Sequence, residues 1–142
     1  MALLTGFILV ALLGIAHHFG ILCVHRCVPR LKQQTHRAVL TAFLGLLVLH
    51  TLEIIAWAGA YAVMLEGEWF GTLGGTYTGS WDDLVYFSGM NFVTLGFTQL
   101  KTDGSIRMIS MMQSLGGFMI LTWSATFIYS IWQDAVKKRR QE

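Results

Sequence analysis

The segment that decides the fold is LVYFSGMNFVTLGFTQL, residues 84–100, which is largely apolar and carries no formal side-chain charge. A helix needs roughly 20 residues to cross the ~30 Å hydrocarbon core of a bilayer, so this segment is short for a crossing. Ser80, just before it, is suited to cap a helix, and Asp82 and Asp83 suit the positive end of a helix dipole. The glycine-rich stretch 66–80 precedes this start and is predicted to be an exposed loop. We therefore expect a short helix that enters a membrane and turns back.

Three longer stretches outside this segment are almost free of charge. They cover residues 2–25, 38–65 and 108–133, the second interrupted only by Glu53. Each is long enough to span a bilayer as a helix. Only 13% of the residues are charged, about half the share usual in soluble domains, which argues against a soluble protein. The predicted fold class is therefore all-α integral membrane, with three transmembrane helices and one re-entrant helix.

The basic residues predict the orientation of these helices. They cluster after the first span and after the third, as Arg26, Arg30, Lys32 and Arg37 and as Lys137, Lys138, Arg139 and Arg140. Both clusters are expected in the cytoplasm, which places the N-terminus outside and the C-terminus inside. A full crossing by residues 84–100 would put the last cluster outside. An interfacial helix with an outward loop is the alternative for this segment, and it leaves the short length unexplained. We expect a multi-pass protein of the plasma (inner) membrane that contacts lipid and binds no nucleic acid.

The predicted organisation has eight parts. In chain order they are a first transmembrane helix (1–25), a cytoplasmic basic loop (26–37), an outer pore-domain helix (38–65), an extracellular loop (66–80), a pore helix and filter (81–100), an outer loop (101–107), an inner pore-lining helix (108–136) and a cytoplasmic basic tail (137–142). Cys23 and Cys27 fit neither a zinc spacing nor a disulfide framework, so they are expected to be apolar helix residues.

The names given to the pore parts come from a resemblance. The run YFSGMNFVTLGFTQL, residues 86–100, resembles the pore helix and selectivity filter of the potassium-channel superfamily, where an aromatic-Phe-Ser start leads to a Thr-Val-Gly-Tyr-Gly-Asp filter. Four residues match the first filter positions conservatively, namely Thr94, Leu95, Gly96 and Phe97. The next two depart from the pattern, because Thr98 replaces the second glycine and Gln99 replaces the acid.

The resemblance extends from about residue 14 to residue 133. An arginine and a glycine hinge follow the filter in this superfamily, and Arg107 and Gly116–Gly117 have similar placement. HHFG (17–20) and HTLEIIAW (50–57) also resemble helices of small bacterial three-span members. The resemblance implies a homotetramer, in which each chain has three identical partner subunits around a cation pathway.

The resemblance also implies a function and a set of site residues. We expect passive conduction of monovalent cations, K⁺ first and Na⁺ second, with no enzymatic activity, no cofactor and no bound metal. The expected filter residues are Thr94, Leu95, Gly96, Phe97, Thr98 and Gln99, with Asn91 behind them as pore support. The expected hinge or pore-lining residues are Gly116, Gly117, Leu121, Ala125 and Tyr129. For the two glycines, a close helix crossing is an equal alternative to a hinge.

Thr98 is predicted to weaken selectivity for potassium. Glycine lets a filter backbone adopt positive φ, whereas a β-branched residue there costs on the order of 1–3 kcal/mol. We expect the inner half of the filter, formed by the Thr94 hydroxyl and the carbonyls of Thr94 and Leu95, to be retained. The outer half should be rearranged or wider.

Four polar residues lie inside the predicted spans. His50 and Glu53 are three residues apart on one helix face, and His17 and His18 lie at a similar depth on the antiparallel first helix. A histidine of the first helix can thus pair with His50 or Glu53. Such a network would hold helices together, respond to pH, or ligate a metal or haem. Two competing functions follow, a b-type haem redox protein that uses His17, His18 and His50, and a nonconducting channel homologue.

Overall fold

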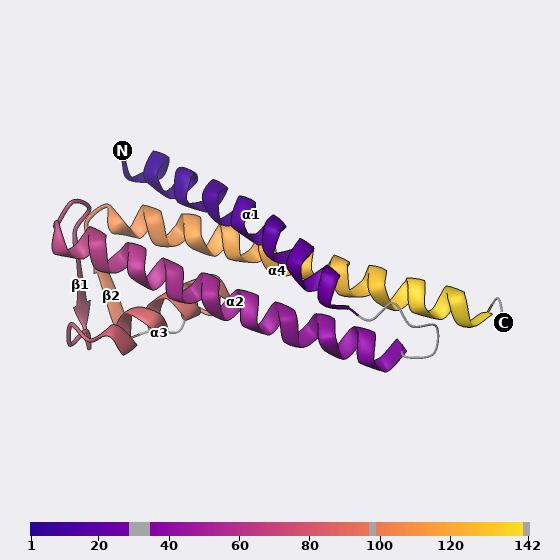
Figure 1. The fold of residues 1–142 in the computed structure, drawn as a ribbon. Helices are drawn as coiled ribbons and strands as arrows, with labels where there is room; N and C mark the ends of the chain where they lie inside the picture. Colours follow the sequence, from indigo (N-terminus) through magenta and orange to yellow (C-terminus); the bar gives the residue numbers. More distant parts are fainter. Residues whose placement is uncertain (29–34, 97–98, 141–142) are drawn as a thin grey trace.

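The computed structural model describes residues 1–28, 35–96 and 99–140, and Figure 1 shows its fold. The described residues are mostly helical. In chain order the elements are α1 (Ala2–Cys27), α2 (Thr35–Glu66), β1 (Thr72–Gly75), α3 (Trp81–Phe92), β2 (Leu100–Asp103) and α4 (Ile106–Arg140).

The three long helices are the candidate membrane spans. Helix α1 and the stretches His36–Glu66 and Ile106–Asp134 are long and apolar enough to cross a bilayer. The three helices run side by side (Figure 1), and the two strands lie at one end of the bundle, which we call the strand end. Helix α4 continues to Arg140, past the end predicted at residue 136, because lysine and arginine are good helix formers.

Helix α1 lies against both α4 and α2 through glycines. An added Cβ at any of four glycines would overlap a side chain of the neighbouring helix; the pairs are Gly6–Met112, Gly116–Val10, Gly20–Leu49 and Gly45–Val24. Small residues let helix backbones approach closely inside a membrane, where dispersion contacts replace the hydrophobic effect as the source of stability. These contacts fix the rotation of α1 about its own axis.

A two-stranded antiparallel sheet was not predicted. Strand β1 pairs with β2 in a register that runs from Thr72 opposite Asp103 to Gly75 opposite Leu100. The sequence predicts only loops over 66–80 and 101–107, because the first segment is glycine-rich and neither has the apolar alternation of a strand. Gly71 and Gly75 have φ of +117° and +74° and lie against carbonyl oxygens of β2 and its flank, where no side chain fits. The all-α expectation is therefore incomplete, because the described part of the chain also contains a small two-stranded sheet.

Helix α3 begins where the sequence predicted. The Ser80 side chain accepts a hydrogen bond from the Asp83 backbone nitrogen at 3.2 Å, which caps the helix. The Asp83 carboxylate in turn accepts hydrogen bonds from the backbone nitrogen and the hydroxyl of Thr78, both at 2.8 Å. Together these bonds hold the first turn of α3 at the strand end of the bundle.

Helix α3 ends beside the middle of α2 and about a third of the way along α4. It contacts α2 and α4, and the buried ring of Phe87 packs edge-on against Tyr61 at 5.0 Å between centroids. Its last residue, Phe92, lies beside His50 of α2 and Gly117 of α4. Gly117 is roughly 16 Å along α4 from Ile106, at 1.5 Å per residue. The chain has returned to the strand end of the bundle by Leu100, where β2 begins.

Candidate functional site

The first candidate site is the end of α3, where the chain turns. The Leu95 nitrogen donates to the Met90 carbonyl at 3.1 Å, and the Thr94 nitrogen donates to the Asn91 carbonyl at 3.0 Å. This pair of bonds is a Schellman cap, whose left-handed position is usually glycine. Thr94 occupies it with φ of +59°. Backbone strain is therefore found at Thr94. Thr98, where the sequence predicts strain, lies outside the described residues, as does Phe97.

The backbone after the cap is accessible in the single chain. Leu95 is 59% exposed, and Gly96 has φ of +67° with no heavy atom within 4 Å of an added Cβ. Gln99 lies next to the two-stranded sheet, where its carbonyl oxygen accepts a long hydrogen bond from the Thr76 nitrogen at 3.4 Å. The described filter residues thus form an open turn between α3 and β2.

Asn91 lies in the last turn of α3, next to this cap. Its side-chain nitrogen, Nδ2, is buried and has no hydrogen-bond partner among the described residues. A buried amide without a partner costs about 1–3 kcal/mol. A polar group supplied from outside the described part of the chain would remove that cost.

A network of polar side chains that was not predicted from the sequence holds α3 between α2 and α4. The Tyr61 hydroxyl donates to Gln113 Oε1 at 2.8 Å, and Gln113 Nε2 donates to the carbonyl and hydroxyl oxygens of Ser88. Ser88 in turn donates to the Ile54 carbonyl at 2.8 Å. The available indication was Gln113 itself, an amide within an apolar stretch. Fully bonded networks of this kind specify a unique packing.

The predicted hinge and lining residues of α4 divide into two groups. Gly116 faces Val10 of α1, and Gly117 faces the Phe92 carbonyl of α3, so both glycines lie at close helix crossings. Leu121 is half-buried, whereas Ala125 and Tyr129 are exposed. A hinge motion at the glycines stays a prediction.

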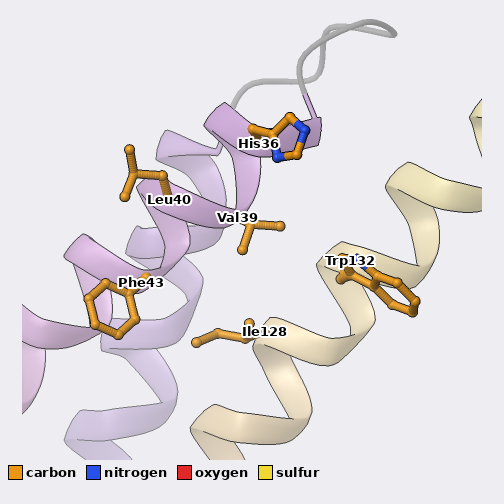
Figure 2. Close-up of a pocket in the computed structure, with 6 residues that line it drawn as sticks. All are labelled: His36, Val39, Leu40, Phe43, Ile128 and Trp132. Atoms are coloured by element: carbon orange, nitrogen blue, oxygen red, sulfur yellow. The ribbon is translucent and has the colours of Figure 1, made fainter.

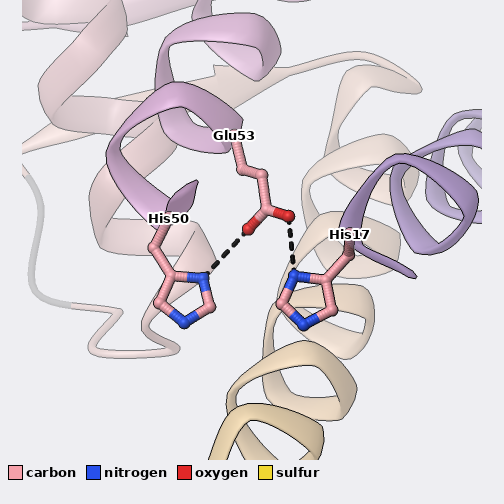
Figure 3. Close-up of side chains that lie close together, drawn as sticks. All are labelled: His17, His50 and Glu53. Atoms are coloured by element: carbon pink, nitrogen blue, oxygen red, sulfur yellow. Dashed lines mark hydrogen bonds and ion pairs between the residues drawn. The ribbon is translucent and has the colours of Figure 1, made fainter. Parts of the chain in front are cut away.

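The second candidate site is a buried cluster of two histidines and a glutamate. Figure 3 shows both imidazoles pointing at one carboxylate. His17 Nδ1 lies 2.8 Å from Glu53 Oε1, and His50 Nδ1 lies 3.0 Å from Glu53 Oε2. The other nitrogen of His17, Nε2, is 3.3 Å from Ser124 Oγ of α4. The cluster, defined by His17, His50 and Glu53, therefore joins α1 to α2, and Ser124 connects it to α4.

His18 is not part of this cluster. Successive residues of a helix point about 100° apart, so only one of two adjacent histidines can face α2. His17 is fully buried, whereas His18 is exposed and lies beside Trp123 and Phe19. Because both ring nitrogens of His17 already have partners, ligation of haem iron by His17 would break one of these contacts.

An apolar groove of about 320 Å³ lies at the other end of the bundle, between α2 and α4 (Figure 2). Its lining is mostly aliphatic and aromatic; the residues are His36, Val39, Leu40, Phe43, Ile128 and Trp132. A catalytic or cofactor site needs several convergent polar groups, which this lining does not provide.

Comparison with known proteins gives a partial similarity. Over 61 residues the chain is 31% identical to the uncharacterized membrane protein YdjJ of Bacillus subtilis (strain 168). This match covers 42% of the chain and 18% of that protein, so the chain spans less than a fifth of the relative's length. No family model matches the chain. No solved structure matches it either. The chain is thus a mostly helical membrane protein with three candidate spans, similar in part to another membrane protein.

Proposed function

We propose that four copies of this chain form a potassium-channel-like pore that conducts monovalent cations passively. The observation that carries the proposal is the path of the chain from α3 to β2. Helix α3 ends inside the bundle, beside Gly117 of α4 and His50 in the middle of α2, and an accessible turn at residues 94–96 follows before the chain returns.

Such a turn needs protein or water around it. Irregular backbone at membrane depth is tolerated only when it is buried in protein or lines a water-filled cavity. The exposure of Leu95 supports assembly with further copies around this turn, and so does Asn91 Nδ2, which is buried without a hydrogen-bond partner among the described residues. The resemblance of residues 86–100 to a channel filter supports four copies, arranged with closed rotational symmetry.

The chemistry of the turn favours cations. The C-terminal end of α3 carries the negative end of its dipole, and the carbonyl groups that follow can replace the hydration oxygens of an ion. The basic residues after α1 and at the end of α4 support an orientation with the N-terminus outside the plasma membrane and the C-terminus in the cytoplasm. In this orientation α3 enters from the outside as a re-entrant helix.

The test is cation flux into liposomes that contain the purified full-length protein. Native mass spectrometry should first give a tetramer. Wild type and Gly14→Ala, whose new Cβ has no neighbour within 4 Å, should conduct K⁺. Gly96→Ala should conduct at least tenfold less, since φ of +67° disfavours any Cβ. A stable tetramer with no flux of any cation over a wide range of pH and voltage would instead favour the nonconducting homologue.

Selectivity is tested at Thr98, which lies outside the described residues. We propose weakened discrimination between K⁺ and Na⁺ because Thr98 replaces a glycine of the filter pattern. Thr98→Gly should raise the K⁺ preference measured from reversal potentials in bilayers. Strong K⁺ preference in wild type, or no change on substitution, would contradict this account.

The haem protein is the competing function. An absorbance scan of the purified protein tests it, because a Soret band that disappears in His50→Ala would indicate haem ligation. A colourless tetramer that conducts cations would exclude it.

A further inference from the structure

The charge of Glu53 has no lysine or arginine to balance it. Residues 2–25, 38–65 and 108–133 contain neither residue type, and Glu53 is 4% exposed. A buried carboxylate is strongly unfavourable unless a positive group is near. Within the spans, the groups that face it are His17 of α1, His50 of α2 and, through His17, Ser124 of α4. The charge is therefore removed by protonation of Glu53 itself, or it is balanced by a proton on a histidine or by a bound cation.

We propose that His17, His50 and Glu53 bind a divalent transition-metal ion, with Zn²⁺ as the representative case. Two imidazole nitrogens and a carboxylate oxygen form a ligand set that suits zinc and related ions, whereas Mg²⁺ and Ca²⁺ prefer oxygen ligands alone. This proposal departs from the expectation of no bound metal, and it is independent of whether the protein conducts ions.

The geometry needs only a small adjustment. One ligand atom from each of the three residues lies within 4.8 Å of the other two. Ligands of a tetrahedral zinc ion are about 3.3 Å apart, given bonds of about 2.0–2.1 Å. The widest pair must therefore close by at most roughly 1.5 Å, which side-chain rotation can supply.

The protonation of His17 is compatible with metal binding. When a metal binds Nδ1, the ring proton must sit on Nε2, and Ser124 Oγ at 3.3 Å can accept a hydrogen bond from it. In many proteins a hydrogen bond from the ring nitrogen that does not bind the metal orients the histidine. Without metal the same hydroxyl can donate to Nε2 while Nδ1 donates to Glu53. Ser124 thus fits both forms. Metal binding would replace the hydrogen bond between His17 Nδ1 and Glu53 and would keep the contact between Nε2 and Ser124.

Titration of the metal-free, purified full-length protein with Co²⁺ tests the proposal, because bound Co²⁺ gives visible absorption bands. Wild type should bind one Co²⁺ per chain, and Zn²⁺ should displace it. His17→Ala, His50→Ala and Glu53→Gln should each weaken binding at least tenfold. His18→Ala is the matched control, since His18 neighbours His17 but lies outside the cluster, and it should bind as wild type does. Equal binding by all variants, or none below millimolar Co²⁺, would overturn the proposal.

A measurement on the wild-type protein alone still tests the proposal if the variants fail to fold. The X-ray absorption spectrum of the zinc-loaded protein should show nitrogen and oxygen ligands with an imidazole pattern. Sulfur ligands would place the metal at the exposed Cys23 and Cys27 instead and would overturn the assignment. Flux measurements on the metal-free and zinc-loaded protein would show separately whether conduction depends on the site.

Discussion

Gly117 of α4 lies directly against the carbonyl oxygen of Phe92, the last residue of α3, so that a Cβ at position 117 would overlap that oxygen. The contact sets how far α3 reaches along the bundle. It therefore also sets the depth of the turn at residues 94–96, on which the proposed pore depends.

Gly117→Ala should destabilise the protein by about 1–3 kcal/mol, because a methyl group placed against rigid backbone forces α3 and α4 apart. Thermal unfolding in detergent measures the loss. Gly14→Ala is the control, since its Cβ meets no atom within 4 Å, and it should be neutral or slightly stabilising. Equal effects of the two substitutions would mean that the contact does not hold α3 in place.

Thr94→Gly should stabilise the fold by about 1 kcal/mol, because glycine adopts the left-handed conformation of a helix cap without the strain of a β-branched residue. Thr94→Asn should lie between glycine and threonine, since asparagine tolerates this conformation better. Cation flux should fall in both variants because the hydroxyl expected to line the filter is removed. If Thr94→Gly instead lowers the free energy of unfolding, the Thr94 hydroxyl stabilises the fold by more than the strained backbone destabilises it.

A double-mutant cycle should show that His17 and Glu53 are coupled. Their 2.8 Å contact is buried, so the cycle of His17→Ala and Glu53→Gln should give a coupling free energy of about 1–3 kcal/mol. Unfolding is measured with a chelator present, which keeps any metal out of the comparison. The cycle of His18→Ala and Glu53→Gln should be additive within about 0.5 kcal/mol. Additivity in the first cycle would contradict the contact.

The start of α3 should lose stability in acid. The hydrogen bond from the Thr78 backbone, together with that from its hydroxyl, lowers the pKa of Asp83 below its usual value. A lowered pKa in the folded state means that the stabilisation is present above the unfolded pKa of about 3.9 and disappears as pH falls through the folded value. Asp83→Ala should therefore be less stable than wild type at pH 6, and the difference should shrink below about pH 4.

Thermal unfolding between pH 3 and pH 7 checks this dependence. Asp82→Ala is the control, because it removes a neighbouring charge in the same helical turn but leaves the bonds between Thr78 and Asp83 in place. A difference between wild type and Asp83→Ala that stays constant with pH would contradict the role of the carboxylate charge.

Much of this architecture could be predicted from the order of residues. The positions of charges along the chain located the three long helices, and Ser80 marked the start of α3. That residues 84–100 do not form a fourth long helix could also be anticipated, because an apolar stretch of this length is too short to cross a bilayer, and α3 indeed ends at Phe92. These features depend on neighbours in the sequence, where hydrophobicity and capping act locally.

What the tertiary structure decided is which distant groups meet. The sequence by itself identified His17 and His18 as equal candidates, and only the rotation of α1, set by contacts such as Gly6–Met112, directed His17 to Glu53. The same holds for the pairing of β1 with β2 and for Gln113 between Tyr61 and Ser88. Long-range pairs depend on how whole helices pack, and a rotation of 100° exchanges one adjacent side chain for the next. Local sequence therefore determined the spans, while helix packing decided the composition of the buried cluster.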